Sequence, residues 1–335
     1  MDGWIEMTDV KTVLKRMSAE LDAPIRSYIG DETPSNLIEA ARQYPYAGGK
    51  RMRPSMVVAA CGAVGGSRDR AVPLAVAIEY LHNFSLIHDD LMDGDEKRRG
   101  MTTSHVKYGM PTAILAGDAL FAKAFDIISG LDVPDGTLRK ILKVVSTAVW
   151  DLARGQQMDI NNENGEAVSM DDYIETIRLK TSVLFAAGAA GGALVGNADD
   201  RTVESVREYA MSLGVAFQMF DDILGIVGDP AITGKSSGND IRKGKSTVIV
   251  CHALENIKDE SEMKMFRSIL GKLDASESEI DLVRDILKRT GSIDYAVKMA
   301  ERYTNDAISK LDCLEQSDEK DFMIALARYA MSREL

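Results

Sequence analysis

The spacing of apolar residues along this chain repeats with the period of an α-helix, and this feature constrains the fold most strongly. Near the start, apolar residues recur three and four positions apart, at Val10, Val13, Leu14, Met17 and Leu21. We find no convincing run in which apolar and polar residues alternate, as they do in a half-buried strand, apart from the ambiguous segment 247–250. The spacing therefore predicts an all-α fold, built as a single large helical bundle.

Signals for the starts and ends of helices occur throughout the chain. Thr33 and Pro34 resemble an N-cap residue followed by proline at the first helical position, and Ser169 with Asp172 resembles a capping box ahead of a helix over 173–180. Residues that break helices gather at 134–136, 161–165, 196–200 and 228–244. None of these gaps looks like a linker between domains, so we predict that residues 1–335 form one domain.

One helical segment combines glycine with alanine at close spacing. Gly188, Gly191, Gly192 and Gly196 lie within it. Because glycine has no side chain, this stripe predicts close packing against neighbouring helices in preference to ligand binding.

Composition and charge exclude several classes of protein. Hydrophobic residues make up 45% of the chain and charged residues 27%, which excludes disordered and low-complexity proteins. The net charge of −12 argues against a nucleic-acid-binding surface. The three cysteines, Cys61, Cys251 and Cys313, match neither a disulfide framework nor a zinc site, which favours the cytoplasm. We expect no signal peptide, and the longest apolar stretch, 183–196, is too short to span a bilayer.

Two acidic pairs each follow an apolar run directly. Asp89 and Asp90 follow the run 81–87, and Asp93 lies one helical turn beyond Asp89 on the same face; the second pair, Asp221 and Asp222, follows the run 215–220. A single such pair is more often a solvated surface than a metal site. Like charges beside a core need a counter-cation, however, and carboxylate oxygens suit Mg²⁺. The presence of both pairs therefore predicts metal binding.

Basic residues cluster near glycines instead of spreading along helix faces. The segment GGKRMRP, at 48–54, combines flexible backbone with three cations, which suits a diphosphate. Further cations are Arg98 and Arg99 after the first acidic motif, Lys180 before Thr181, and Lys235 and Lys245 around the glycine-rich segment after the second motif. Together with the acidic pairs, these clusters predict a site for two polyanions, one held through metal and one through cations.

Six motifs in order resemble the trans-type polyprenyl diphosphate synthases: GGKRMRP, His82 with LIHDDLMDGDEKRRG, KT, FQMFDDILG, GK and GKST. The match runs from about residue 48 to residue 247 and is closest to archaeal-type short-chain geranylgeranyl and farnesyl diphosphate synthases. The resemblance implies the isoprenoid synthase type I fold, an all-α bundle with a central cavity, and usually a homodimer. It also implies isopentenyl diphosphate and allylic diphosphates as substrates, with about three Mg²⁺ ions as cofactors.

The resemblance assigns a role to each candidate residue. Asp89, Asp93 and Asp221 would bind Mg²⁺, with Asp90 and Asp222 supporting them. Arg98, Lys180, Lys235 and Lys245 would hold the allylic diphosphate, whereas Lys50, Arg53, His82 and Arg99 would hold isopentenyl diphosphate. Thr181 and Gln218 would stabilise the allylic cation that forms when diphosphate departs. The double bond of isopentenyl diphosphate then attacks this cation and a proton is lost, so no protein nucleophile is needed.

One position departs from the pattern, because Gly225 stands where many members have a third aspartate. Glycine is also found there in archaeal-type short-chain enzymes, so we expect activity to be retained, and the departure weakens only the metal assignment on that side.

Product length is expected to depend on Phe84, five residues before Asp89, with Leu81 and Ser85 beside it. Five helical residues rise about 7.5 Å, a plausible depth for the floor of a cavity, although an ideal helix turns Phe84 about 140° away from Asp89. Short-chain members often carry an aromatic residue at this position, and the first acidic motif has no insertion. The resemblance therefore favours geranylgeranyl diphosphate (C20), with farnesyl diphosphate (C15) as the alternative.

Three other functions compete with this interpretation. His82, His88 and Asp89 could belong to an HD-type metal phosphohydrolase, which would leave the second acidic pair and GGKRMRP only partly explained. A non-catalytic synthase subunit would be expected to lack some of the carboxylates or cations that are present. A class I terpene cyclase shares the first acidic motif but does not need the isopentenyl cations.

Overall fold

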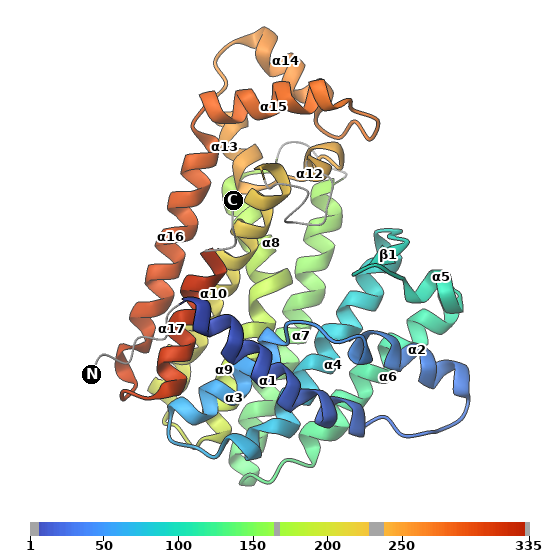
Figure 1. The fold of residues 1–335 in the computed structure, drawn as a ribbon, viewed down its shortest axis with the longest axis vertical. Coiled ribbons are helices and arrows are strands. Elements are labelled where there is room, and N and C mark those ends of the chain that lie inside the picture. Colours follow the sequence, from blue (N-terminus) through green and yellow to red (C-terminus); the bar gives the residue numbers. More distant parts are fainter. Residues whose placement is uncertain (1–6, 164–167, 228–237, 332–335) are drawn as a thin grey trace. The chain divides into compact units, whose positions relative to one another are not determined.

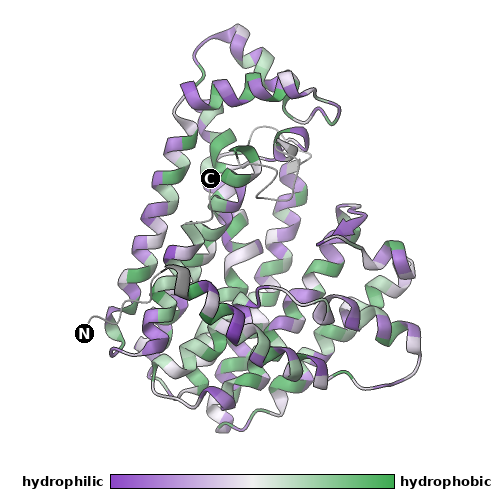
Figure 2. Ribbon diagram, in the orientation of Figure 1, coloured by the Kyte–Doolittle hydropathy of each residue, from purple (hydrophilic) through white to green (hydrophobic). Residues whose placement is uncertain are grey.

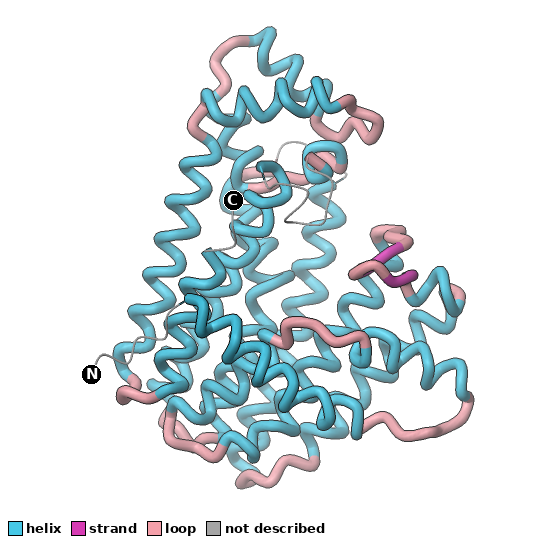
Figure 3. The backbone as a smooth tube through the Cα atoms, in the orientation of Figure 1, coloured by secondary structure: helices cyan, strands magenta, loops and turns pink. Residues whose placement is uncertain are grey.

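The computed structural model describes residues 7–163, 168–227 and 238–331, and these residues are almost entirely helical (Figures 1 and 3). Strand occurs among them only in one two-stranded antiparallel hairpin, β1 (Lys97–Arg98) and β2 (Met101–Thr102). The all-α prediction is confirmed. The ambiguous segment 247–250 opens a helix, because the Thr247 side chain accepts a hydrogen bond from the backbone N–H of Val250.

The chain divides into two compact units. The first contains residues 1–149, 184–207 and 311–325, and the second contains 150–183, 208–310 and 326–335. The prediction of one domain with a central cavity stays a prediction.

The first unit is built on α4 (Arg68–Met92), which packs against α3 (Met52–Ala63) and α6 (Met110–Ser129). The other elements of this unit are α1 (Met7–Ser27), α2 (Ser35–Tyr46), the hairpin, α5 (Ser104–Tyr108), the first half of α7 (Asp135–Glu163), α9 (Val183–Val195), the start of α10 (Asp200–Val227), η2 (Leu311–Cys313) and the first part of α17 (Asp318–Met331). The glycine stripe in α9 packs as predicted, since a Cβ atom on Gly192 would lie 2.1 Å from the Val57 carbonyl oxygen of α3.

The second unit has its own apolar core. It contains α8 (Met170–Ile177), the π-helix η1 (Arg178–Ser182), α12 (Asn239–Arg242), α13 (Val248–Asn256), α14 (Glu260–Ile269), α15 (Glu277–Arg289) and α16 (Ser292–Lys310), with the later parts of α7 and α10. Helix α13 packs against α8, α15 and α16. Hydrophobic and hydrophilic residues alternate along α16 in Figure 2, as in a helix with one face in the core and one in water.

The two predicted helix starts have different outcomes. Ser169 is the N-cap of α8 and accepts a hydrogen bond from the backbone N–H of Asp172, so this helix begins directly after the predicted cap, but it covers Met170–Ile177 and not 173–180. The prediction at Thr33 is wrong by one position: Pro34 is itself the N-cap of α2, with no side-chain cap. Proline fits this position because its fixed φ angle suits the extended conformation of an N-cap residue.

One described helix, α10, is long and apolar enough to cross a membrane by length and composition alone. Its most apolar window is 61% buried within the protein, as in a core helix.

Candidate active site

The first acidic motif lies at the C-terminal end of α4. Asp89 is half-buried and Asp93 is the exposed C-cap, whose backbone N–H donates to the Asp89 carbonyl oxygen at 2.8 Å. The two residues are therefore one helical turn apart on the same face, as the sequence predicted. Carboxylates at this spacing can share one divalent cation.

Asp90, between these residues, is turned inward and is only 1% exposed. The Arg98 side chain donates to both of its carboxylate oxygens, at 2.6 and 2.8 Å from Nε, and the Tyr44 hydroxyl of α2 donates to Oδ2. Arg98 is brought there by the hairpin, whose turn residues Arg99 and Gly100 both have positive φ angles, as in a type I′ turn. Asp90 is thus held from two sides by residues of α2 and of the hairpin.

Arg53 and His82 lie together in the first unit, although 29 residues separate them. Arg53 Nη1 is 3.3 Å from His82 Nε2, and its guanidinium lies 4.3 Å from the ring centre of Phe185. Burial lowers the pKa of His82 well below its usual value, and the charges of nearby arginines, Arg53 first among them, lower it further. A neutral His82 can accept a hydrogen bond from Arg53 and so hold its guanidinium in place.

Arg99 lies against the glycines of the GGKRMRP segment. Its Nη1 donates to the Gly48 carbonyl oxygen at 2.8 Å, and a Cβ atom on Gly49 would lie 2.7 Å from the same nitrogen. Lys50, the next residue, is exposed. The structure therefore brings Arg99 beside the segment that carries Lys50 and Arg53, and a side chain at position 49 would require the end of the Arg99 side chain to shift.

Arg51, the remaining cation of GGKRMRP, does not belong with the diphosphate-binding cations, so this part of the prediction is wrong. Its side chain is 1% exposed and forms a buried ion pair with Glu79, donates to the Pro45 carbonyl oxygen and lies 3.6 Å from Asp22. Its left-handed backbone, with φ of 47°, turns it away from its neighbours at the start of α3. Arg51 therefore ties α3 to α4 and is not available to a substrate.

In the second unit, Lys180 and Thr181 lie in the π-helix that links α8 to α9. A Cβ atom on Gly155 of α7 would be 2.3 Å from the Lys180 backbone nitrogen, and one on Gly214 of α10 would be 2.6 Å from the Ser182 Cα atom. A π-helical turn is wider than an α-helical one, and the missing side chains at Gly155 and Gly214 leave room for it between α7 and α10. Single π-helical turns inside α-helices occur frequently at functional sites.

A pocket of about 130 Å³ in the second unit gathers many of the predicted allylic-site residues. Its walls include Asp159, Asn162, Tyr173, Thr176, Ile177, Lys180, Thr181, Gln218, Asp222, Lys245, Ser246 and Thr247. Five of these, Lys180, Thr181, Gln218, Asp222 and Lys245, were predicted from the sequence.

A chain of hydrogen bonds crosses this pocket. The Thr181 hydroxyl donates to Gln218 Oε1 at 3.0 Å, Gln218 Nε2 donates to Asp222 Oδ1 at 3.0 Å, and the Tyr173 hydroxyl donates to Asp222 Oδ2 at 2.6 Å. Burial raises the pKa of Asp222 to about 7, against the opposing effect of these two donors. A cation bound nearby would favour the ionised form of this carboxylate.

Both described lysines of the allylic set are paired with acidic residues. Lys180 forms an ion pair with Asp159, and Lys245 Nζ is 3.5 Å from Asp240 Oδ1. Burial lowers the pKa of Lys245, and the carboxylates of Asp240, Asp222 and Asp159 raise it by more. The fourth predicted cation, Lys235, lies outside the described residues.

Gly225, the departure from the family pattern, has a structural reason. A Cβ atom at this position would lie 2.0 Å from Oδ2 of Asp240, so a side chain here would require the Asp240 carboxylate to move. Position 225 is one turn beyond Asp221 on the same face of α10. A carboxylate from α12 therefore occupies the place where a third aspartate of the motif would begin.

The acidic residues offer oxygen ligands, which Mg²⁺ prefers, and they occur in pairs. Among residues 7–163, 168–227 and 238–331, no three histidine, cysteine or acidic side chains gather as a metal site of their own. Mg²⁺ typically keeps several waters and binds one or two carboxylates together with substrate phosphates. Paired carboxylates next to cations fit a metal that arrives with a diphosphate.

Tyr44, Tyr173 and Asp159 were not among the site residues predicted from the sequence. The tyrosines carry no charge and belong to no acidic or basic cluster, so the sequence contained no signal for them. Asp159 could have been found, because it lies one turn after Gly155 in α7, and a glycine inside a helix marks a close approach.

Phe84 is half-buried on α4 and contacts aromatic rings on two sides. Its ring centre is 5.5 Å from that of Phe121 on α6 and 5.0 Å from that of His88, both in edge-on geometry. The neighbouring chain-length candidates Leu81 and Ser85 are buried. His88 Nε2 is 3.2 Å from the Ile114 carbonyl oxygen, so this histidine bridges α4 to α6.

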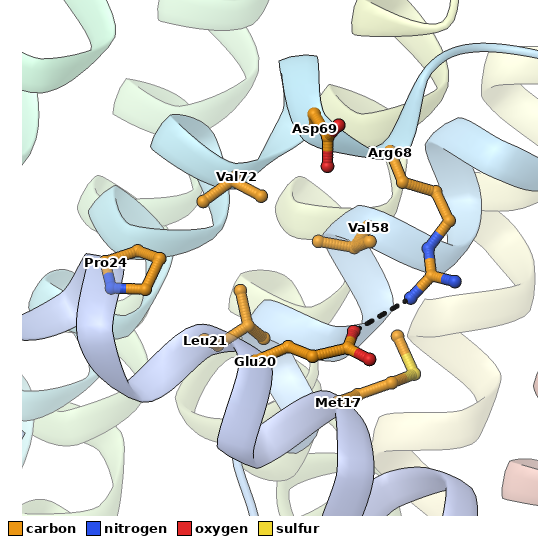
Figure 4. A pocket seen from close by; sticks show the side chains of 8 residues that line it. All are labelled: Met17, Glu20, Leu21, Pro24, Val58, Arg68, Asp69 and Val72. Carbon is orange, nitrogen blue, oxygen red and sulfur yellow. Dashed lines mark hydrogen bonds and ion pairs between the residues drawn. The ribbon is translucent and has the colours of Figure 1, made fainter.

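A larger cavity of about 540 Å³ lies in the first unit between α1, α3 and α4 (Figure 4). An ion pair between Arg68 and Glu20, with 3.4 Å between nitrogen and oxygen, crosses it. Val72, which lines it, precedes Asp89 by 17 residues, or about 25 Å along α4. None of the predicted substrate-binding residues lines this cavity.

The chain is similar to known proteins along almost its whole length. A family model described as polyprenyl synthetase matches residues 35–287. A geranylgeranyl diphosphate synthase from Methanosarcina mazei is 39% identical over 321 residues, which cover 96% of this chain and 97% of that protein. The solved geranylgeranyl pyrophosphate synthetase of Pyrococcus horikoshii Ot3 has a TM-score of 0.93 at 39% identity, covering 98% of this chain and 99% of that one. The polyprenyl synthase of Caulobacter crescentus CB15, solved with calcium and isoprenyl diphosphate, has a TM-score of 0.86 at 28% identity, covering 100% of both chains.

Proposed function

Because this chain belongs to the polyprenyl synthetase family and is a prenyltransferase, we propose that it condenses isopentenyl diphosphate with allylic diphosphates and, with Mg²⁺, makes geranylgeranyl diphosphate. The observation that carries the proposal is the pocket of the second unit, because it combines two of the predicted lysines, Lys180 and Lys245, with the Thr181–Gln218 pair and Asp222. The relatives named geranylgeranyl diphosphate synthases favour this product over farnesyl diphosphate.

We assign the metal ligands to Asp89, Asp93 and Asp221. Asp90 and Asp222 are held inward by hydrogen bonds and support them. Bound Mg²⁺ supplies Lewis-acid stabilisation of the negative charge that develops on the departing diphosphate. The calcium and isoprenyl diphosphate bound to the Caulobacter crescentus enzyme support a divalent cation in this role.

The allylic diphosphate is assigned to Arg98, Lys180, Lys235 and Lys245. These cations hold its oxygens and neutralise charge as the bond to carbon breaks. The oxygens of Thr181 and Gln218 then present the negative ends of their dipoles to the allylic cation. Isopentenyl diphosphate is assigned to Lys50, Arg53, His82 and Arg99, which orient its double bond for attack.

Incubating the purified protein with Mg²⁺, isopentenyl diphosphate and each allylic diphosphate in turn tests this function. Mass spectrometry of the dephosphorylated products should find geranylgeraniol as the main product. Farnesol as the end product would support the alternative assignment. A preparation that forms no prenyl product with any allylic starter would be a non-catalytic subunit.

The two substrate sites should respond to different substitutions. We expect Arg53→Ala to raise the KM for isopentenyl diphosphate about tenfold or more, since it removes a charge-assisted contact to phosphate. Lys180→Ala should instead lower kcat or raise the KM for the allylic substrate. Steady-state kinetics with each substrate varied in turn measures both effects, and equal effects of both variants on one substrate would contradict the division of the basic residues.

Product length should depend on the aromatic ring at position 84. We expect Phe84→Ser to shift products to longer chains, because a bulky ring packed on Phe121 is replaced by a small side chain. Phe84→Tyr keeps the ring and should keep the product length. Mass spectrometry of the products measures the shift, and an unaltered distribution in Phe84→Ser would assign the floor of the cavity to another residue.

We further propose that the enzyme is a cytoplasmic homodimer. Val106, Met110, Ile114 and Leu115 of α5 and α6 are 39–59% exposed, and neighbouring exposed apolar side chains mark an interface with another protein. On a chain of net charge −12, a patch free of acidic side chains is where a second copy can approach, and residues 106–115 contain none. Met110→Glu should therefore give a monomer by light scattering, whereas Leu273→Glu, at an exposed apolar residue of the second unit, should not.

A further inference from the structure

The second carboxylate of each acidic pair is buried and bonded to a buried tyrosine from a distant part of the chain. Asp90 and Asp222 are 1% and 6% exposed, and their partners Tyr44 and Tyr173 are 3% and 4% exposed. Tyr44 precedes Asp90 by 46 residues, and Tyr173 precedes Asp222 by 49. The same arrangement therefore occurs in both compact units, on α2 and α4 in the first and on α8 and α10 in the second.

Both tyrosines act as hydrogen-bond donors in this arrangement. Burial raises the pKa of the Tyr44 hydroxyl, and its bond to Asp90 raises it further; burial and Asp222 do the same for Tyr173. Each phenol therefore stays protonated at neutral pH. A buried carboxylate that accepts a hydrogen bond from this hydroxyl has little freedom to rotate. Breaking the bond would leave the carboxylate without a donor, at a cost of about 1–3 kcal/mol.

Fixing the second carboxylate also fixes the direction of the first. Successive residues of an α-helix point about 100° apart around its axis, so a helix end held with Asp90 inward presents Asp89 and Asp93 on another face. The same relation holds between Asp222 and Asp221. A second carboxylate free to rotate could instead compete with the first for the same cation.

Building on the proposed function, we propose that Tyr44 and Tyr173 are positioning residues that hold Asp90 and Asp222 away from the metals and so orient Asp89 and Asp221 toward them. The two tyrosines should not contribute equally. Asp90 keeps both hydrogen bonds from Arg98 when Tyr44 loses its hydroxyl. When Tyr173 loses its own, Asp222 keeps, among the described residues, the bond from Gln218. Loss of the Tyr173 hydroxyl should therefore have the larger effect.

Tyr44→Phe and Tyr173→Phe each remove one hydroxyl and keep the ring. Metal affinity can be measured without turnover by titrating Mn²⁺ in the presence of inorganic pyrophosphate. The electron paramagnetic resonance signal of the free ion reports how much Mn²⁺ is bound. We expect Tyr173→Phe to weaken Mn²⁺ binding about tenfold or more, within the range seen when groups that orient metal ligands are lost, and Tyr44→Phe to weaken it less. The Mg²⁺ concentration that gives half-maximal activity should rise in the same order.

The matched control is Tyr80→Phe. Tyr80 is fully buried and its hydroxyl donates to the Ile25 carbonyl oxygen at 2.6 Å, so the control loses a comparable hydrogen bond that involves no aspartate. It should lower the melting temperature and leave metal affinity unchanged. If Tyr44→Phe and Tyr173→Phe behave like Tyr80→Phe, the tyrosines are structural only and the inference is wrong. A wild-type protein without Mg²⁺-dependent prenyl transfer would overturn the proposed function instead, which separates the two failures.

Discussion

Asp89→Asn should lower the turnover number by about 10²–10³-fold, the size of effect found when one preorganised group that stabilises transition-state charge is removed. The substitution keeps the shape of the side chain but replaces an anionic oxygen ligand with a weaker neutral one. Asp93, one turn further on, cannot supply the lost charge, so metal binding on this face is reduced to a single carboxylate. The KM for isopentenyl diphosphate should change little, because its assigned cations belong to other residues. Steady-state kinetics over a range of Mg²⁺ concentrations measures both quantities.

A carboxylate elsewhere on the same helix provides the control. Asp69 is exposed in the first turn of α4, 20 residues or about 30 Å from Asp89, so Asp69→Asn changes the same chemical group without approaching the acidic motif. It should keep wild-type turnover. Removal of divalent cations with EDTA should abolish activity in both the control and the wild type, and added Mg²⁺ should restore it. Full turnover of Asp89→Asn, or activity that persists in EDTA, would contradict the metal assignment.

Arg51→Met should lower the free energy of unfolding by about 3–5 kcal/mol, the usual cost of removing one partner from a buried ion pair. The substitution leaves the Glu79 carboxylate charged and 3% exposed, and it removes the donor to the Pro45 carbonyl oxygen. Asn83 still donates to Glu79 Oε1 at 3.1 Å but brings no positive charge. Urea denaturation measures the loss.

Two further variants test whether the large loss of unfolding free energy arises from the burial of the Arg51–Glu79 ion pair. Lys140 pairs with Asp200 in the same unit, but these side chains are 55% and 82% exposed, so Lys140→Met should cost less than about 1 kcal/mol. Combining Arg51→Met with Glu79→Leu removes both buried charges and should recover much of the loss. If Arg51→Met lowered the free energy of unfolding no more than Lys140→Met, Arg51 would be available to bind the substrate diphosphate like the other cations of GGKRMRP.

The local patterns of the chain were sufficient to predict its helical fold and to find the contiguous motifs that carry its candidate site residues. The apolar period near residues 10–21 identified α1, and Ser169 identified the start of α8, because these signals depend on contacts within one or two helical turns. The acidic pairs and the lysines beside them could be found for the same reason, since each motif is contiguous. The expectation that Lys180, Lys245 and Asp222 line one site came from the family resemblance, not from spacing, and the three lie in one pocket of the second unit.

Only the tertiary structure decided which member of each motif faces inward. Arg51 and Arg53 are two residues apart in one basic segment, yet the first is buried against Glu79 and the second lies beside His82. The partners that determine these directions come from segments about 30 to 50 residues away, as do the tyrosines that hold Asp90 and Asp222. Spacing within a helix establishes which residues share a face, but which face is buried, and against what, depends on helices that pack together only in the folded chain.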